Sequence, residues 1–268
     1  MPLITFIVPV SDSDVYQQCF LGSPLFRKTS DFQIIGQAGF RNAATAFNDG
    51  LDKAASDLIV CSHQDVVIPT SWAKRFLTRL EELDSLRVPV GVVGCGGITS
   101  QGLPIGHFYR HDREFLAPLP LPARVETLDE MLISFRKGTG LRFDAELPSF
   151  FSYATDLCLQ AAAARLQNYV VDAPCFHQAH SRLGKLPRGF FEGRNYLCEK
   201  WRAVLPVQTL SGPLDHKRSY LVYRLKEWIR KRMPRPVSYS PSWWWEDLRK
   251  IDPDDILLAD RDQREQET

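Results

Sequence analysis

A polar tripeptide, His63-Gln64-Asp65, interrupts the otherwise apolar run of residues 57–68. The preceding Leu58-Ile59-Val60 is typical of a strand buried on both faces, and ligands of open α/β sheets bind outside the carboxyl ends of such strands. A carboxylate at Asp65, with His63 on the same side of an extended chain, could hold a divalent cation against a phosphate. The alternative, which the tripeptide alone favours, is a solvated turn after a core strand.

Three other carboxyl groups are candidates for acid–base chemistry. Asp129 and Glu130 are adjacent within the strand-like run of residues 125–135, where burial without partners is costly, so they belong either to a site or to an exposed strand edge. Asp156 stands near the start of residues 150–166, an alanine-rich stretch of high helix propensity. It could act as a general base at a pocket rim, but the residues alone favour a carboxylate that caps the helix or complements its dipole.

Two histidines, His177 and His180, follow a short strand-like run. Both could face a metal ion, although such a pair is more often ordinary surface or core polar chemistry. The glycines of Gly94-Cys95-Gly96-Gly97 match neither a P-loop nor a dinucleotide fingerprint, so we expect a turn there.

The elements that must position these residues alternate along the chain. Apolar runs predict strands near residues 3–10, 32–36, 58–60, 88–93, 125–135 and 169–171. Amphipathic patterns predict helices over residues 42–55, 71–83 and 150–166, the first interrupted by Gly50. The proline-rich residues 102–122 predict an irregular loop or flap. This order indicates an α/β fold with a mainly parallel sheet and helices on its faces.

The composition is that of an ordinary soluble globular protein, with 268 residues, 44% of them hydrophobic and 24% charged. The formal net charge of +1 gives no overall attraction to nucleic acid, and we expect no nucleic-acid partner. No apolar stretch is long enough to span a membrane, and no signal peptide is evident, so a cytoplasmic protein is expected. The six cysteines are widely spaced, which predicts reduced core residues.

The charge pattern changes after residue 213. A basic amphipathic helix is predicted between Lys217 and Met233, followed by Trp243-Trp244-Trp245 and an acidic tail. Such a helix could lie on the anionic inner face of a membrane, but packing on its own domain is the default. We therefore divide the chain into a domain of residues 1–213 and a C-terminal helical extension of residues 214–268.

Over residues 3–213 the sequence resembles a GT-A glycosyltransferase, close to the family-2-like bacterial group. The motifs, in chain order, are FIVPV, NDGLDKA, DLIVCSHQDV, VGVVGCGG, ETLDEMLISFRK with Phe143-Asp144, SYATDLCLQA, VVDAPCFH and KWRAVLPVQT. The resemblance lies in their order and spacing together. It implies a GT-A-type, Rossmann-like sheet with flanking helices and a nucleotide-sugar donor.

The resemblance also implies roles for individual residues. Asp65 would hold Mn²⁺ or Mg²⁺ against the donor diphosphate, with His177 completing the coordination and His180 as a substitute. Asp156 would deprotonate the acceptor hydroxyl. The other implied positions, which line the donor and acceptor, are Pro9, Val10, Asp12, Gln37, Asn48, His63, Asp129 and Glu130.

Three residues depart from the family pattern. His63 replaces an aspartate and leaves fewer hard oxygen ligands, Gln37 replaces an acidic residue, and Thr155 replaces the acidic neighbour of Asp156. The expectation is an inverting glycosyltransferase acting on a glycan or lipid-linked acceptor. The alternatives are a nucleotidyltransferase and a non-catalytic sugar-nucleotide-binding protein.

Overall fold

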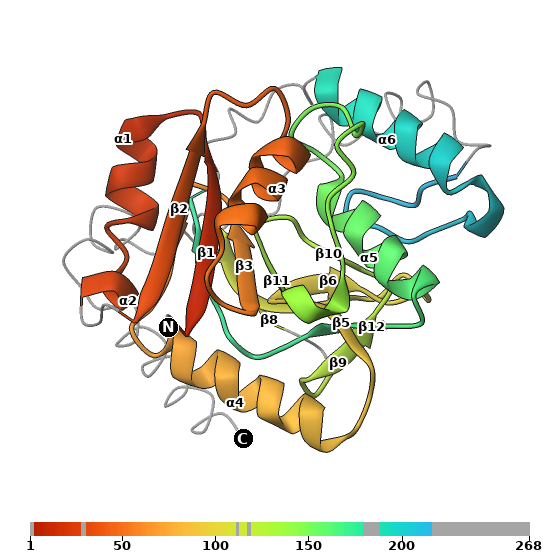
Figure 1. Cartoon of the computed structure of the whole chain (residues 1–268). Coiled ribbons are helices and arrows are strands. Elements are labelled where there is room, and N and C mark those ends of the chain that lie inside the picture. Colours follow the sequence, from red (N-terminus) through yellow and green to blue (C-terminus); the bar gives the residue numbers. More distant parts are fainter. Residues whose placement is uncertain (1–2, 28–30, 111–112, 117–118, 179–187, 216–268) are drawn as a thin grey trace.

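The computed structural model describes residues 3–27, 31–110, 113–116, 119–178 and 188–215 (Figure 1). His180, the helix predicted between Lys217 and Met233, and the tryptophan cluster lie outside the described residues.

A seven-stranded sheet forms the centre of the fold, in the order β2-β1-β3-β11-β5-β12-β9. Strands β2, β1, β3, β5 and β12 run in one direction, and β11 and β9 run in the other. The strands are β1 (Ile4–Val10), β2 (Phe32–Ala38), β3 (Leu58–Ser62), β5 (Val90–Gly94), β9 (Ala123–Val125), β11 (Leu132–Arg136) and β12 (Gln167–Val170). The predicted α/β class with flanking helices is confirmed.

A second sheet has the order β10-β6-β7-β13-β4, with β8 paired to β7. Its strands are β4 (Val66–Val67), β6 (Gly96–Ile98), β7 (Pro104–Arg110), β8 (Arg113–Leu116), β10 (Thr127–Leu128) and β13 (Phe176–His177). The prediction of an irregular segment at residues 102–122 was wrong, because β7 and β8 pair as antiparallel strands. The single strand predicted over residues 125–135 was also wrong, because β10 and β11 belong to different sheets and Asp129 and Glu130 lie in the connection between them.

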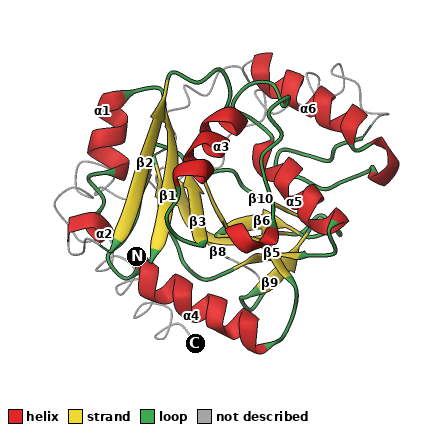
Figure 2. Ribbon diagram, viewed as in Figure 1, coloured by secondary structure: helices red, strands yellow, loops and turns green. Residues whose placement is uncertain are grey.

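Helices flank the sheets (Figure 2). The α-helices are α1 (Ser13–Val15), α2 (Pro24–Arg27), α3 (Ala43–Lys53), α4 (Trp72–Ser85), α5 (Tyr153–Ala163) and α6 (Arg188–Lys200). A π-helix spans Tyr16–Phe20, and short 3₁₀ turns span Lys137–Thr139 and Arg202–Val204. Asn42 caps α3 by accepting a hydrogen bond from the Thr45 backbone N–H at 2.8 Å. α3 continues through Gly50, where an added Cβ would lie 2.3 Å from Ile7 Cγ2, so the glycine permits close packing on β1.

The core has two parts, one on each face of the central sheet. Along β1, Ile7 packs in the cluster that includes α3 and α5, whereas Phe6 and Val8 pack in the cluster that includes α4. This division follows from the alternation of side chains along a strand. Trp72 of α4 lies 5.8 Å from Phe6, ring centre to ring centre, and seats that helix on the sheet.

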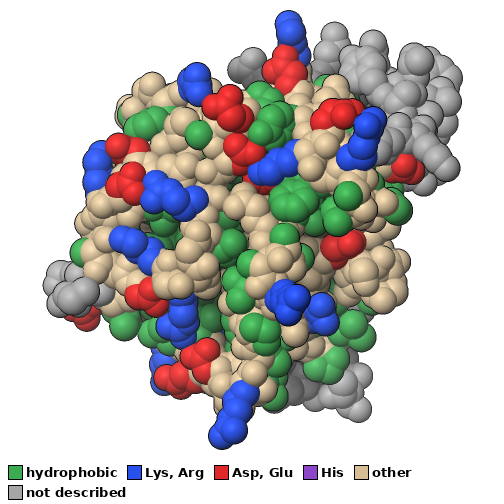
Figure 3. Space-filling model, turned by 45° about the vertical axis from the view of Figure 1, so that its right-hand side comes forward, with side chains coloured by type: hydrophobic (Ala, Val, Ile, Leu, Met, Phe, Trp, Pro, Cys, Tyr) green, Lys and Arg blue, Asp and Glu red, His purple; other side chains and the backbone are tan. Residues whose placement is uncertain are grey.

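No helix in the described ranges is both long and apolar enough to cross a membrane. The six cysteines are free thiols and five are buried, as the sequence predicted. On the face shown in Figure 3, basic and acidic side chains are interspersed, which agrees with the balanced charge of the sequence.

Candidate active site

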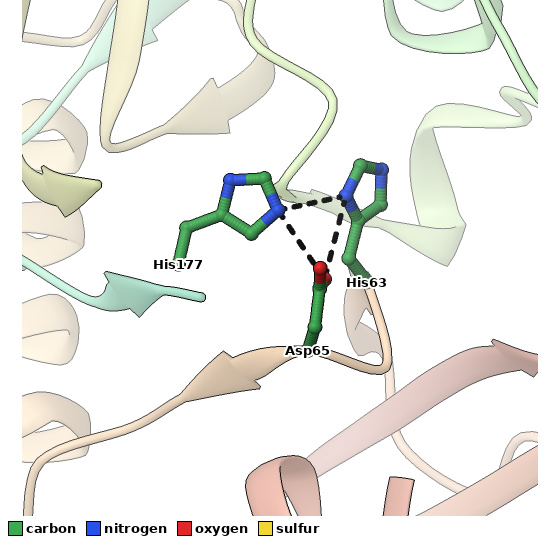
Figure 4. Close-up of side chains that lie close together, drawn as sticks. All are labelled: His63, Asp65 and His177. Atoms are coloured by element: carbon green, nitrogen blue, oxygen red, sulfur yellow. Dashed lines mark hydrogen bonds and ion pairs between the residues drawn. The ribbon is translucent and has the colours of Figure 1, made fainter. Parts of the chain in front are cut away.

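His63, Asp65 and His177 converge on one point (Figure 4). His177 Nε2 lies 3.2 Å from Asp65 Oδ1 and 3.4 Å from His63 Nδ1, and His63 Nδ1 lies 3.9 Å from Asp65 Oδ1. Pairing of β13 with β4 brings His177 beside Val66, and the Gln178 backbone N–H donates to the Asp65 carbonyl at 2.9 Å. The strands thus bring together residues that are far apart in the sequence.

Asp65 is held as a carboxylate by its neighbours. Burial by itself would raise the pKa of this carboxyl, but the hydrogen bond and charge of His177, with the charge of His63, lower the pKa below its usual value. An ionised carboxylate oxygen beside two imidazole nitrogens offers three ligand atoms, all within 4.8 Å of one another. This mixed donor set fits a transition-metal dication such as Mn²⁺ better than Mg²⁺, which prefers oxygen ligands alone.

The cluster lies at a topological switch point of the sheet. The chain leaves β1 to form β2 on one side and returns to form β3 on the other side. Gln64 bridges the carboxyl ends of β1 and β3, because its Oε1 accepts from the backbone N–H groups of Ser11 at 2.8 Å and Asp12 at 3.0 Å. Pro9 and Val10 end β1 at this edge. In open α/β sheets such a point is where ligands bind.

Glu130 approaches the cluster from the β10–β11 connection. One of its carboxylate oxygens, Oε1, accepts from the Ser152 backbone N–H, and its own carbonyl accepts from the Tyr153 hydroxyl at 2.7 Å. Burial, with the adjacent charge of Asp129, raises the pKa of Glu130 to about 8. Asp129 itself accepts from the Met131 backbone N–H at 2.9 Å.

Asp156 lies in the first turn of α5 and is only 1% exposed. Its Oδ1 accepts from Trp201 Nε1 at 2.7 Å, its Oδ2 accepts from Gln160 Nε2 at 2.7 Å, and Lys200 Nζ lies 2.8 Å from Oδ1 and 3.0 Å from Oδ2. The predicted cap at Asp156 was wrong, because Ser152 is the cap residue, but the acidic Asp156 lies in the first turn, where it complements the helix dipole as the same prediction also allowed. The alternative of a carboxylate at a pocket rim was also wrong, because the side chain is buried.

Three further predicted site residues have partners within the fold. Asp12 caps α1 by accepting from the backbone N–H groups of Asp14 at 3.0 Å and Val15 at 3.1 Å. Gln37 donates to Asp49 Oδ2 at 2.6 Å. The Asn48 amide donates to the Phe143 carbonyl at 2.7 Å and accepts from the Phe143 N–H at 3.1 Å. Each of these three side chains therefore has a structural role within the fold.

The sequence analysis gave no role to Lys200, Trp201 or Asp144. Lys200 Nζ lies 2.6 Å from Asp144 Oδ2 as well as beside Asp156, so one ammonium joins two carboxylates. Tyr196 donates to the same Asp144 oxygen at 2.8 Å. The signals in the sequence were the KWRAVLPVQT motif, which contains Lys200 and Trp201, and the Phe143-Asp144 motif, and neither indicates the partners of these residues.

Comparisons with known proteins give distant similarities. No family model matches the chain. A protein of Fuscovulum blasticum described as "ATP synthase subunits region ORF 6" is 29% identical over 169 residues, which are 60% of this chain and 66% of that protein. The chain therefore spans a little under two thirds of this relative's length. Among solved structures, S. aureus TarS aligns with a TM-score of 0.47 and 11% identity, over 74% of this chain and 39% of the TarS chain.

Proposed function

We propose that this chain is an inverting glycosyltransferase that moves a sugar from a nucleotide-diphosphate donor to a hydroxyl of a glycan or lipid-linked acceptor. The observation that carries the proposal is the convergence of His63, Asp65 and His177 at the switch point of the sheet. The ordered motifs of residues 3–213 support it, because their pattern resembles that of GT-A glycosyltransferases.

Each part of the site has a task in this reaction. His63, Asp65 and His177 would hold Mn²⁺, which when bound stabilises negative charge on the departing diphosphate. The end of β1 at Pro9 and Val10 would border the nucleotide, since it adjoins the cluster through Gln64. The acceptor oxygen attacks the anomeric carbon while the bond to the diphosphate breaks, and a group of the protein must take the acceptor proton.

A panel of ligands tests the proposal. Uridine, guanosine and thymidine diphosphates and their hexose conjugates are added to the protein with and without MnCl₂, and the melting temperature is recorded. A ligand that binds only the folded state raises the melting temperature, and we expect the largest rise with Mn²⁺ and one nucleotide class. If no member of the panel shifts the transition, the proposed donor site is wrong.

Product analysis separates the alternatives. A glycosyltransferase releases a nucleoside diphosphate, whereas a nucleotidyltransferase releases pyrophosphate. A non-catalytic sugar-nucleotide-binding protein would bind the donor without any turnover, including hydrolysis.

We also propose a cytoplasmic site of action at the inner face of a membrane, on the basis of the basic amphipathic pattern between Lys217 and Met233. Co-sedimentation with anionic and neutral liposomes tests this location. Salt-sensitive binding to anionic vesicles is expected, and equal recovery with both vesicle types would contradict it.

A further inference from the structure

We infer that Glu130, and not Asp156, takes the proton from the acceptor hydroxyl. This inference rests on the proposed glycosyl transfer and names the general base of that reaction. It follows from the surroundings of the two carboxylates.

Both oxygens of the Asp156 carboxylate are already engaged by donors of the fold. A carboxylate has about four lone-pair sites on its two oxygens. At Asp156 each oxygen has two cationic or N–H partners, which are Trp201 and Lys200 at Oδ1, and Gln160 and Lys200 at Oδ2. Since the side chain is also 1% exposed, an acceptor hydroxyl could reach it only by displacing these partners.

The Glu130 carboxylate is differently placed. Its Oε1 is oriented by the Ser152 backbone N–H. Its Oε2 accepts no hydrogen bond from any residue in the described ranges, and the residue is partly exposed. One oxygen is therefore anchored and the other is available to a hydroxyl, which is the arrangement a general base requires.

Glu130 is tied to the cluster of His63, Asp65 and His177 without belonging to it. The Tyr153 ring lies 6.4 Å from the His63 ring, and the Tyr153 hydroxyl donates to the Glu130 carbonyl at 2.7 Å. The next carbonyl, that of Met131, accepts from the His63 backbone N–H at 2.9 Å. An inverting displacement needs its base and its leaving group at separate positions of one site, and the contacts through Tyr153 and Met131 hold the Glu130 backbone beside the cluster.

The proton transfer balances. The acceptor O–H bond breaks and its proton moves to Glu130, while the oxygen forms a bond to the anomeric carbon. The bond from that carbon to the diphosphate oxygen breaks, and the electron pair leaves with the nucleoside diphosphate. The ionisable group that acts on the Glu130 carboxyl is Asp129, on its own connection. Tyr153 of α5, which donates to the Glu130 carbonyl, is in turn affected by Glu130, Asp129, Asp65 and Cys61. A base in acidic surroundings binds the proton more strongly than a free carboxylate does.

The test compares Glu130→Gln with wild-type protein in the Mn²⁺-dependent release of nucleoside diphosphate from UDP-, GDP- and dTDP-hexoses, with water as acceptor. Glutamine keeps an oxygen for the Ser152 N–H but accepts no proton. We expect release to fall by ~100-fold or more, with the nucleotide-induced melting shift retained. The rising alkaline limb of the wild-type pH–rate profile should be lost in this variant.

Glu126→Gln is the matched control, because Glu126 is a carboxyl of the same segment that accepts from the Gln208 backbone N–H and lies outside the site. Its release rate should equal that of the wild type. If Glu130→Gln released nucleoside diphosphate at the wild-type rate, the role of Glu130 would be overturned and the proposed function would stand. If the wild-type protein released no nucleoside diphosphate from any donor, the proposed function would fail and the role of Glu130 with it.

Discussion

His177 Nε2 lies 3.2 Å from Asp65 Oδ1, and a second histidine–aspartate pair, His107 Nδ1 and Asp172 Oδ1, lies 2.5 Å apart elsewhere in the fold. The two pairs differ in the side chain that lies beside them. The first pair has an imidazole, that of His63, whereas Asp172 is also bonded to the Arg75 guanidinium at 3.1 Å. A cation beside Asp172 opposes metal binding, so of the two pairs only the first offers its ligand atoms without a fixed positive charge beside the carboxylate.

This contrast gives the first prediction. His177→Ala should weaken Mn²⁺ binding by ~10-fold or more, because it removes one of three ligand atoms. His107→Ala removes a comparably buried histidine and should leave Mn²⁺ affinity unchanged. Calorimetric titration of each variant with MnCl₂ makes the measurement. Equal affinities in the two variants would show that the cluster does not bind the ion.

The strand ends and the helices could be predicted locally, but the environment of each carboxylate could not. The apolar run before His63 and the helical pattern of residues 42–55 are short-range patterns, and both appear where expected. Asp65 meets His177 only through the pairing of β4 with β13, and Asp156 is covered only because α6 ends at Lys200 beside it. Such long-range contacts leave no trace in spacing along the chain. The sequence therefore predicted a carboxylate at the end of β3 but not the burial of Asp156.

A second prediction concerns the pH dependence of stability. The pKa of Glu130 is raised from 4.5 to about 8, so between these values the folded protein binds more protons than the unfolded chain. The free energy of unfolding should therefore decrease as pH rises through this range. Glu130→Gln removes this contribution. The free energy of unfolding of the variant, taken relative to that of the wild type, should therefore be on the order of 1–3 kcal/mol higher at about pH 8 than at about pH 5.

Urea unfolding at the two pH values measures this effect. Glu126→Gln should retain the wild-type dependence of stability on pH, because Glu126 bonds the Gln208 backbone N–H and its replacement leaves the Glu130 carboxyl in place. If Glu130→Gln and the wild type lost stability in parallel as the pH rose, the Glu130 carboxyl would not be protonated in the folded protein.

A third prediction assigns Asp156 a structural role. Asp156→Asn removes the charge that faces Lys200 in a buried setting and should lower the free energy of unfolding by ~3 kcal/mol. Asp156→Asn combined with Lys200→Met should cost less than the sum of the two single changes, because the partners are then removed together. Urea unfolding of the four proteins gives the coupling. Loss of sugar transfer at unchanged stability in Asp156→Asn would return the role of general base to Asp156.

A fourth prediction concerns the packing of α3 on β1, which supports the edge where the cluster lies. Alanine favours helix by ~1 kcal/mol over glycine, yet Gly50→Ala should be net destabilising by ~1–2 kcal/mol. The reason is that the added Cβ would lie 2.3 Å from Ile7 Cγ2 in a core where neither backbone can easily move. Ile7→Ala removes that methyl group, so in the Ile7→Ala background the same glycine change should become neutral or stabilising. Thermal unfolding of the double-mutant cycle measures this reversal, and a Gly50→Ala protein more stable than the wild type would show that α3 can shift away from β1.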